Sequence, residues 1–131
     1  MDNQEVSKGK RIVGYILSGL VALALAFSAV AKLLQFGVGT KEMDDSMQHI
    51  GWRPDQLTAL GIVELACVVF YLIPQTSVLG AILITAYMGG AIATHARVGD
   101  VFIIQILIGI LAWLGIWLRE PRLRPIVPIR K

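Results

Sequence analysis

Four apolar stretches, separated by shorter polar segments, occupy most of the chain. They run from about residue 12 to 34, 57 to 73, 78 to 94 and 101 to 118. A membrane-spanning helix needs about 20 predominantly apolar residues, with a range of roughly 17 to 25. The last three stretches lie at the short end of that range, which limited tilt or a thinned bilayer accommodates. The pattern predicts an all-α integral membrane protein that folds as a four-helix bundle.

The connection between the first two stretches is too long for a simple turn. Its apolar residues follow helical spacing, a threonine stands at the position of an N-cap, and a glycine follows where a helix would stop. These residues are, in order, Thr40, Met43, Met47, Ile50 and Gly51. We expect a short amphipathic helix in this outer loop, which either packs at the membrane interface or forms a lid over a pocket.

Basic residues gather at the two ends of the chain. Eight of the twelve Lys and Arg lie there: Lys8, Lys10, Arg11, Arg119, Arg122, Arg124, Arg130 and Lys131. Four spans place both ends on one side, and the positive-inside rule assigns that side to the cytoplasm. We therefore expect a cytoplasmic N-terminus (1–11), a spanning domain (12–118) and a basic cytoplasmic tail (119–131). The expected location is the cell membrane, which is the inner membrane if the source is bacterial.

Composition restricts the chemistry. Hydrophobic residues make up 56% of the chain and charged residues 16%, which indicates that the lipid bilayer is its main partner. The 131 residues leave no room for a separate soluble catalytic module. The net charge of +3 reflects topology, so nucleic acid is not an expected partner. The single cysteine, Cys67, excludes an internal disulfide and a Cys-x-x-Cys redox pair.

Three of the stretches carry an ionisable side chain at similar predicted depth, namely Lys32, Glu64 and His95. A charge inside hydrocarbon costs at least a few kcal/mol, and such residues usually face the bundle interior, pair with one another and mark a functional site. Gln105, at comparable depth, adds an amide that both donates and accepts hydrogen bonds. If all four side chains face inward, the bundle holds a polar pocket that opens to the outer side.

Two interpretations of this group stay open. Glu64 must be paired, protonated or hydrated, and Lys32 is its nearest counter-charge by depth. The pair is either a structural device that fixes helix register or part of a site for a ligand or for proton exchange. His95 could exchange protons with Glu64 or with a ligand, or it could be an interfacial residue.

Two further residues are candidates for ligand contact. Arg97 could bind an anionic group or a phospholipid headgroup. Tyr71 lies two helical turns from Glu64 on roughly the same face, where it could join Glu64 and His95 around a quinone headgroup. We expect no metal site, because Glu64 and His95 are too few ligands and His49 would have to swing in from the loop.

Small residues recur at helical spacing in three of the stretches, a pattern that permits close helix packing in lipid. They are Gly14, Ser18, Ala22 and Ala26 in the first, Ala86, Gly89, Gly90, Ala93 and Thr94 in the third, and Gly109 and Ala112 after Gln105 in the fourth. We expect these glycines to serve helix packing.

The same segments resemble the DoxX-like family of small membrane proteins. The resemblance rests on FSAVAKL at 27–33, LGIVEL at 60–65 and ATHAR at 93–97, in that order, and it extends over about residues 14–118. It implies a four-helix membrane bundle and points to Lys32, Glu64 and His95 as the matching polar positions. Members of the family are linked to membrane redox work, including a subunit of a thiosulfate:quinone oxidoreductase and a partner of superoxide dismutase in an oxidative-stress complex.

Three functions follow as hypotheses. The first is an accessory subunit of a quinone-linked membrane redox complex, with a soluble or membrane oxidoreductase as its partner and quinone as the candidate cofactor. The second is a small proton-linked carrier or permease, in which Glu64 titrates and Lys32 is its counter-charge. The third is a stand-alone membrane enzyme with Glu64 and His95 as acid and base. Whether the chain is itself an enzyme stays open.

Overall fold

The computed structural model describes residues 7–130, so residues 1–6 of the expected cytoplasmic N-terminus and Lys131 of the expected tail lie outside the described residues. Within this range the chain forms five α-helices and two 3-10 turns, with no strand. The helices are α1 (Lys8–Leu33), α2 (Lys41–Ile50), α3 (Pro54–Leu72), α4 (Ser77–Arg97) and α5 (Ile103–Arg119), and the turns are η1 (Pro74–Thr76) and η2 (Pro121–Leu123).

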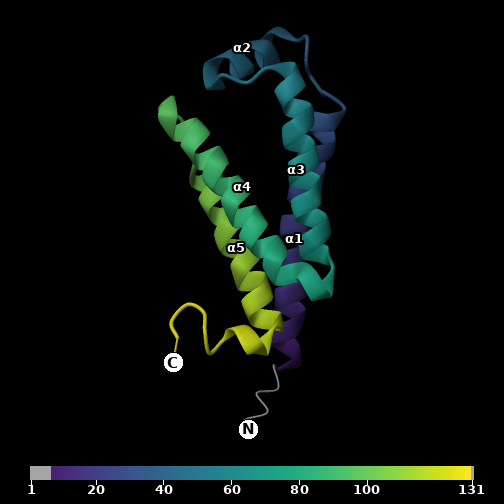
Figure 1. Cartoon of the computed structure of the whole chain (residues 1–131), viewed down its shortest axis with the longest axis vertical. Coiled ribbons are helices and arrows are strands. Elements are labelled where there is room, and N and C mark those ends of the chain that lie inside the picture. Colours follow the sequence, from purple (N-terminus) through teal and green to yellow (C-terminus); the bar gives the residue numbers. More distant parts are fainter. Residues whose placement is uncertain (1–6, 131) are drawn as a thin grey trace.

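The four long helices form a bundle. Three described segments are long and apolar enough to cross a membrane, namely α1, α3 and the continuous segment Pro74–Arg97, while α5 is a shorter apolar helix of 17 residues. Helix α1 contacts α3 and α5, and α4 contacts the same two helices. Figure 1 shows α1 and α3 on one side and α4 and α5 on the other, with the two pairs diverging toward the end that carries α2. The predicted all-α membrane bundle is confirmed.

Large apolar side chains cover the outside of the bundle. Leu23 and Phe27 of α1 and Ile104 of α5 are 69%, 77% and 69% exposed, respectively. A soluble monomer rarely exposes large contiguous apolar patches, whereas a membrane protein places them against lipid tails. The outer surface is therefore suited to a bilayer.

The helices approach most closely near the end that carries the start of α1 and the end of α5. A Cβ atom added to Gly14 of α1 would lie 2.8 Å from the carbonyl oxygen of Gly115 of α5. The hydroxyl of Tyr71, a fully buried residue of α3, donates to the Ala112 carbonyl at 2.8 Å and lies 3.0 Å from the Ser18 hydroxyl. The small residues of α1 thus pack as predicted, and Tyr71 ties α3 to both neighbours.

Helix α2 forms where the loop pattern predicted it. The Thr40 side chain accepts a hydrogen bond from the Met43 amide, and Gly51 ends the helix with a φ of 85°. That left-handed conformation favours glycine because it has no Cβ. Met47 is the buried residue of the helix. The prediction of a short amphipathic helix is confirmed.

The end of α4 holds α2 in place. After Arg97 the chain turns back through Gly99, whose φ is 79°, and the Asp100 amide donates to the His95 carbonyl at 2.9 Å. This Schellman arrangement brings the Asp100 carboxylate 2.9 Å from Nε2 of His49 on α2 and 3.5 Å from Nδ1 of His95. Arg97 donates to the Ile50 carbonyl at 2.6 Å, which satisfies a free acceptor at the end of α2.

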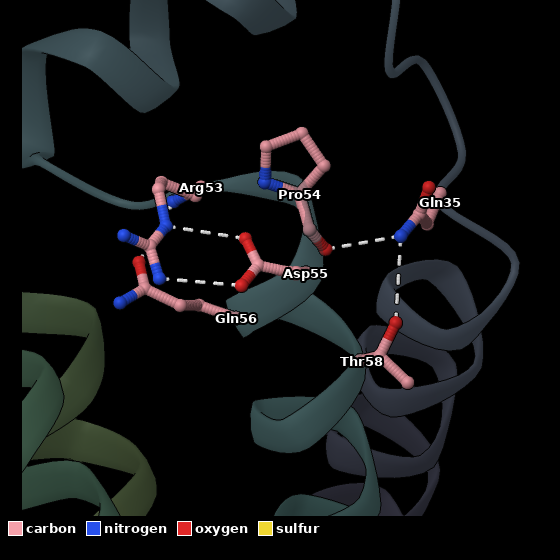
Figure 2. Close-up of polar contacts among 6 residues, drawn as sticks. All are labelled: Gln35, Arg53, Pro54, Asp55, Gln56 and Thr58. Carbon is pink, nitrogen blue, oxygen red and sulfur yellow. Dashed lines mark hydrogen bonds and ion pairs between the residues drawn. The ribbon is translucent and has the colours of Figure 1, made fainter.

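The start of α3 is fixed by polar contacts (Figure 2). Gln35, just after α1, donates to the Pro54 carbonyl at 3.0 Å and to the Thr58 hydroxyl at 3.4 Å. The Arg53 amide donates to the Gln56 side chain at 2.9 Å, and the Arg53 guanidinium pairs with Asp55. Asp55 also lies near the positive end of the helix dipole. The Gln35 contacts join the end of α1 to the start of α3, and the Arg53 contacts cap the first turn of α3.

Replacing Gly80 with alanine should destabilise the bundle. An added Cβ would overlap the backbone of Phe70 and Tyr71, which cannot rotate away as a flexible side chain would. We expect a loss of at least about 1–3 kcal/mol in the free energy of unfolding, measured as a lower thermal midpoint in detergent. Gly89→Ala in the same helix is the matched control, because nothing lies within 4 Å of its added Cβ. Equal midpoints for the two variants would contradict this account of the α3–α4 contact.

The contact of Asp100 with His49, which holds α2 against the end of α4, should weaken as the pH falls. The hydrogen bond from His49 holds the pKa of Asp100 below its ordinary value of 3.8. A carboxyl whose pKa is lowered in the folded state contributes stability above its unfolded pKa and loses it as the pH falls through the folded value. Asp100→Asn should therefore speed hydrogen exchange at the α2 amides near neutral pH. The difference from the unmodified chain should vanish at a pH well below 3.8, after correction for intrinsic exchange rates.

The control for this measurement is Asp55→Asn, which removes a carboxylate from the start of α3 and leaves the contacts of α2 intact. If α2 exchanges at the same rate in the unmodified chain and in the Asp100→Asn variant near neutral pH, the carboxylate does not hold the helix.

Candidate functional site

A pocket of about 530 Å³ lies inside the half of the bundle nearest α2. All four long helices contribute to its wall, together with Ile50 at the end of α2 and Trp52 in the loop that follows. Most of the lining is apolar, and the polar side chains in it are Ser28, Lys32, Glu64, Tyr87, Thr94, His95 and Gln105. Apolar pockets of roughly 300–1,000 Å³ with a few polar groups are typical of small-molecule sites.

An ion pair lies in the wall of this pocket. Nζ of Lys32 is 2.8 Å from Oε2 of Glu64, and the side chains are 25% and 2% exposed, respectively. The ammonium also donates to the Ser28 hydroxyl at 2.6 Å, which in turn lies 3.3 Å from the same carboxylate oxygen. A buried carboxylate is tolerated when a counter-charge and hydrogen bonds replace its hydration.

Tyr87 of α4 completes the contacts of the carboxylate. Its hydroxyl donates to Oε2 of Glu64 at 3.2 Å. All the hydrogen bonds that Glu64 receives from Ser28, Lys32 and Tyr87 use this one oxygen. Within the described chain the second oxygen, Oε1, accepts none, so it remains able to accept a hydrogen bond or a proton from a bound molecule.

The predicted site residues separate into two groups. Lys32, Glu64, His95 and Gln105 all line the pocket, whereas Tyr71 and Arg97 are absent from its lining. Tyr71 is part of the packed core, and Arg97 binds the end of α2. The pocket therefore unites the four residues whose depths matched along the sequence.

His95 and Gln105 occupy different settings within the pocket. The His95 ring is 30% exposed and its Nδ1 faces Asp100. The Gln105 carboxamide forms no hydrogen bond in the described part of the chain, and its Oε1 is buried. An unpaired buried acceptor costs about 1–3 kcal/mol, so a ligand donor placed here would gain a partner that the protein leaves available.

Sequence reasoning missed Tyr87 and Ser28 as functional candidates. Tyr87 lies ten residues before the end of α4 at Arg97, and Glu64 lies ten residues after the start of α3 at Pro54. Both ends are at the α2 end of the bundle, so each residue is about 15 Å deep. This equality of depth was a signal available in the sequence. For Ser28 the signal was its position one helical turn before Lys32, which places both side chains on one face of α1.

The prediction that the glycines serve helix packing is wrong for three of them. Gly89, Gly90 and Gly109 have nothing within 4 Å of an added Cβ. Gly90 lines the pocket, and Gly89 and Gly109 line a groove between α4 and α5. The spacing is the same as in α1, but here the missing side chains leave open space, at Gly90 in the pocket and at Gly89 and Gly109 in the groove.

The ion pair should respond asymmetrically to mutation. Lys32→Met leaves the almost fully buried Glu64 without its counter-charge, and breaking a buried pair in this way costs about 3–5 kcal/mol. Glu64→Gln leaves Lys32, which is 25% exposed and can turn toward the interface, so its cost should be smaller. The double variant should recover part of the loss. The thermal midpoints of the two single variants and the double variant, measured in detergent, test this expectation. Lys41→Met, on the exposed face of α2, is the control. If the losses of the two single variants add up to that of the double variant, the pair is not coupled.

The comparisons with known proteins agree with this architecture. A family model described as the DoxX-like family matches residues 16–118. No curated protein and no solved structure matched the chain. The matched range extends from α1 to α5 and includes the pocket. Because this match covers most of its length, the chain belongs to the DoxX-like family.

Proposed function

We propose that the chain is the quinone-binding membrane subunit of a redox complex and that its pocket receives the quinone headgroup beside Glu64. The observation that carries the proposal is the carboxylate itself. It is 2% exposed and ion-paired, yet it stands in the wall of a pocket of about 530 Å³. A pair that served only helix register would need no cavity next to it.

The polar groups of the pocket suit a quinone in both redox forms. A quinone presents two carbonyl acceptors, and a quinol presents two hydroxyl donors. The Lys32 ammonium, which uses two of its three N–H groups on Ser28 and Glu64, can donate the third to a carbonyl, and the Tyr87 hydroxyl can donate to one by turning away from Glu64. Oε1 of Glu64 and Oε1 of Gln105 can accept from a hydroxyl. The apolar remainder of the wall, with Leu25, Leu60 and Ile108 among its residues, suits the ring.

Proton movement is the chemistry that these side chains can perform. Reduction of a quinone consumes two electrons and two protons. Glu64 can take up a proton from water at Oε1 and release it to the quinone, once for each of the two protons, while Lys32 keeps the carboxylate form stable between transfers. The side chains supply protons and no electrons, so the proposal assigns electron delivery to a soluble or membrane oxidoreductase partner. The redox associations of the DoxX-like family support this assignment.

Tyr87→Phe is the most selective variant for testing the site. It removes one donor from the pocket and leaves the Lys32 and Ser28 contacts of Glu64 in place. A tail-less benzoquinone should raise the thermal midpoint of the unmodified chain by mass action. Loss of one hydrogen bond of about 1.4 kcal/mol should weaken its affinity about tenfold in the variant. Glu64→Gln should weaken it further.

The matched control is Tyr15→Phe, which alters a tyrosine that is 56% exposed on α1 and is not in the pocket wall. If the quinone leaves the midpoint of the unmodified chain unchanged, the pocket is not a quinone site. If, in addition, proteoliposomes carry out a proton-coupled flux that Glu64→Gln stops, the carrier hypothesis replaces the proposal. Co-purification of an oxidoreductase in mild detergent tests the assigned partner.

A further inference from the structure

A second cavity lies on the outer side of the bundle, between α4 and α5. It is a groove of about 490 Å³. Its wall is almost entirely apolar and consists of Thr85, Met88, Gly89 and Ile92 from α4 and Gln105, Ile106, Gly109, Ile110 and Trp113 from α5. Ile106 and Ile110 are 39% and 55% exposed, so the groove adjoins the surface that faces lipid.

Two residues belong to both cavities. Met88 and Gln105 line the groove and also the central pocket. Together they form the partition between the pocket that contains Glu64 and the surface exposed to lipid. Met88 is 5% exposed, and methionine, being unbranched and flexible, can adapt to a change in its packing better than a branched side chain can. The Gln105 carboxamide has no protein partner among the described residues, so no hydrogen bond holds it in the closed position.

Two glycines line the groove, and one hydrogen bond between its walls lies at one end. Gly89 and Gly109 provide the floor, because neither has a side chain and both face open space. At the end farthest from Gln105, the Trp113 indole donates to the Thr85 hydroxyl at 2.7 Å, which joins α4 to α5. Along α5 the distance from Gln105 to Trp113 is about 12 Å. This shape suits one extended apolar chain.

We propose that Met88 and Gln105 form a lateral portal, through which the pocket admits a lipid-soluble ligand whose polar head lies beside Glu64 and whose long apolar chain lies in the groove. The inference rests on the proposed quinone site and adds the entry route and the requirement for a chain. Gln105 lies where head and chain meet, and its amide can donate to a carbonyl or accept from a hydroxyl of the head.

The test fills the groove without touching the pocket. Gly89→Leu and Gly109→Leu each place a side chain into open space on a different helix, and leucine favours a helix more than glycine does. The probes are a benzoquinone with a decyl chain and the same headgroup without a chain, in one detergent throughout. Gly19→Leu on α1 is the matched control, because it also adds leucine to open space and lies outside both cavities.

We expect both groove variants to weaken binding of the decyl quinone about tenfold or more through overlap with the chain. The tail-less quinone should bind each variant and the control with an affinity within about twofold of the unmodified chain. If the decyl quinone also binds unchanged, the chain lies elsewhere and the inference fails, while the quinone site stands. If both probes weaken equally, the substitutions act on the pocket and the inference also fails. If neither probe binds the unmodified chain, the proposed function fails and this inference falls with it.

Discussion

The neutralisation of one carboxylate within an apolar bundle sets the arrangement of the polar half of this protein. Glu64 cannot stay ionised in hydrocarbon without a counter-charge and hydrogen-bond donors. It obtains them from two other helices, through Lys32 and Ser28 of α1 and Tyr87 of α4. Each of these contacts requires a particular rotation of its helix. The carboxylate therefore fixes three helices relative to one another, and hydrophobic matching alone could not do so in a solvent as apolar as the helices themselves.

In the opposite half of the bundle, close contacts between helix backbones fix the arrangement of the helices. Near the start of α1 and the end of α5, small residues bring the helices into close contact, as at Gly14 against Gly115. Gly80 does the same for α4 against Tyr71 of α3. Toward the end that carries α2 the two helix pairs diverge (Figure 1), and nothing lies within 4 Å of an added Cβ at Gly89 and Gly90 of α4. The pocket is a consequence of this divergence, and the polar residues lie where the divergence creates space. Close packing at one end of the bundle and a pocket at the other thus belong to one arrangement of the four helices.

Much of the fold could be predicted from the sequence, because it depends on signals that are local. The apolar stretches predicted the long helices, and Thr40 and Gly51 marked the limits of α2 through their own hydrogen bonding and backbone geometry. Depth along each helix also predicted that Lys32 and Glu64 would meet. The extent of the pocket along the bundle was harder to predict. Tyr71 lies two helical turns from Glu64 on roughly the same face of α3, yet its hydroxyl binds α5 and α1 in the core. Glycine spacing could not separate close packing in α1 from open space in α4 and α5, since the difference depends on how far away the neighbouring helix lies.

Two directions of approach to the pocket, past α2 and between α4 and α5, differ in the contacts that lie across them. Access past α2 requires loss of the contacts that join it to the end of α4, namely those of Asp100 with His49 and of Arg97 with the Ile50 carbonyl. Both involve ionisable groups and so belong to the stronger class of hydrogen bond. Access between α4 and α5 requires movement of Met88, which only packs, and of Gln105, whose amide has no partner in the described chain. Movement of Met88 and Gln105 therefore breaks no hydrogen bond of the described chain, whereas movement of α2 breaks two. The lateral route therefore suits a molecule that is already dissolved in the bilayer, and the contacts of α2 suit it to covering the end of the pocket that it faces.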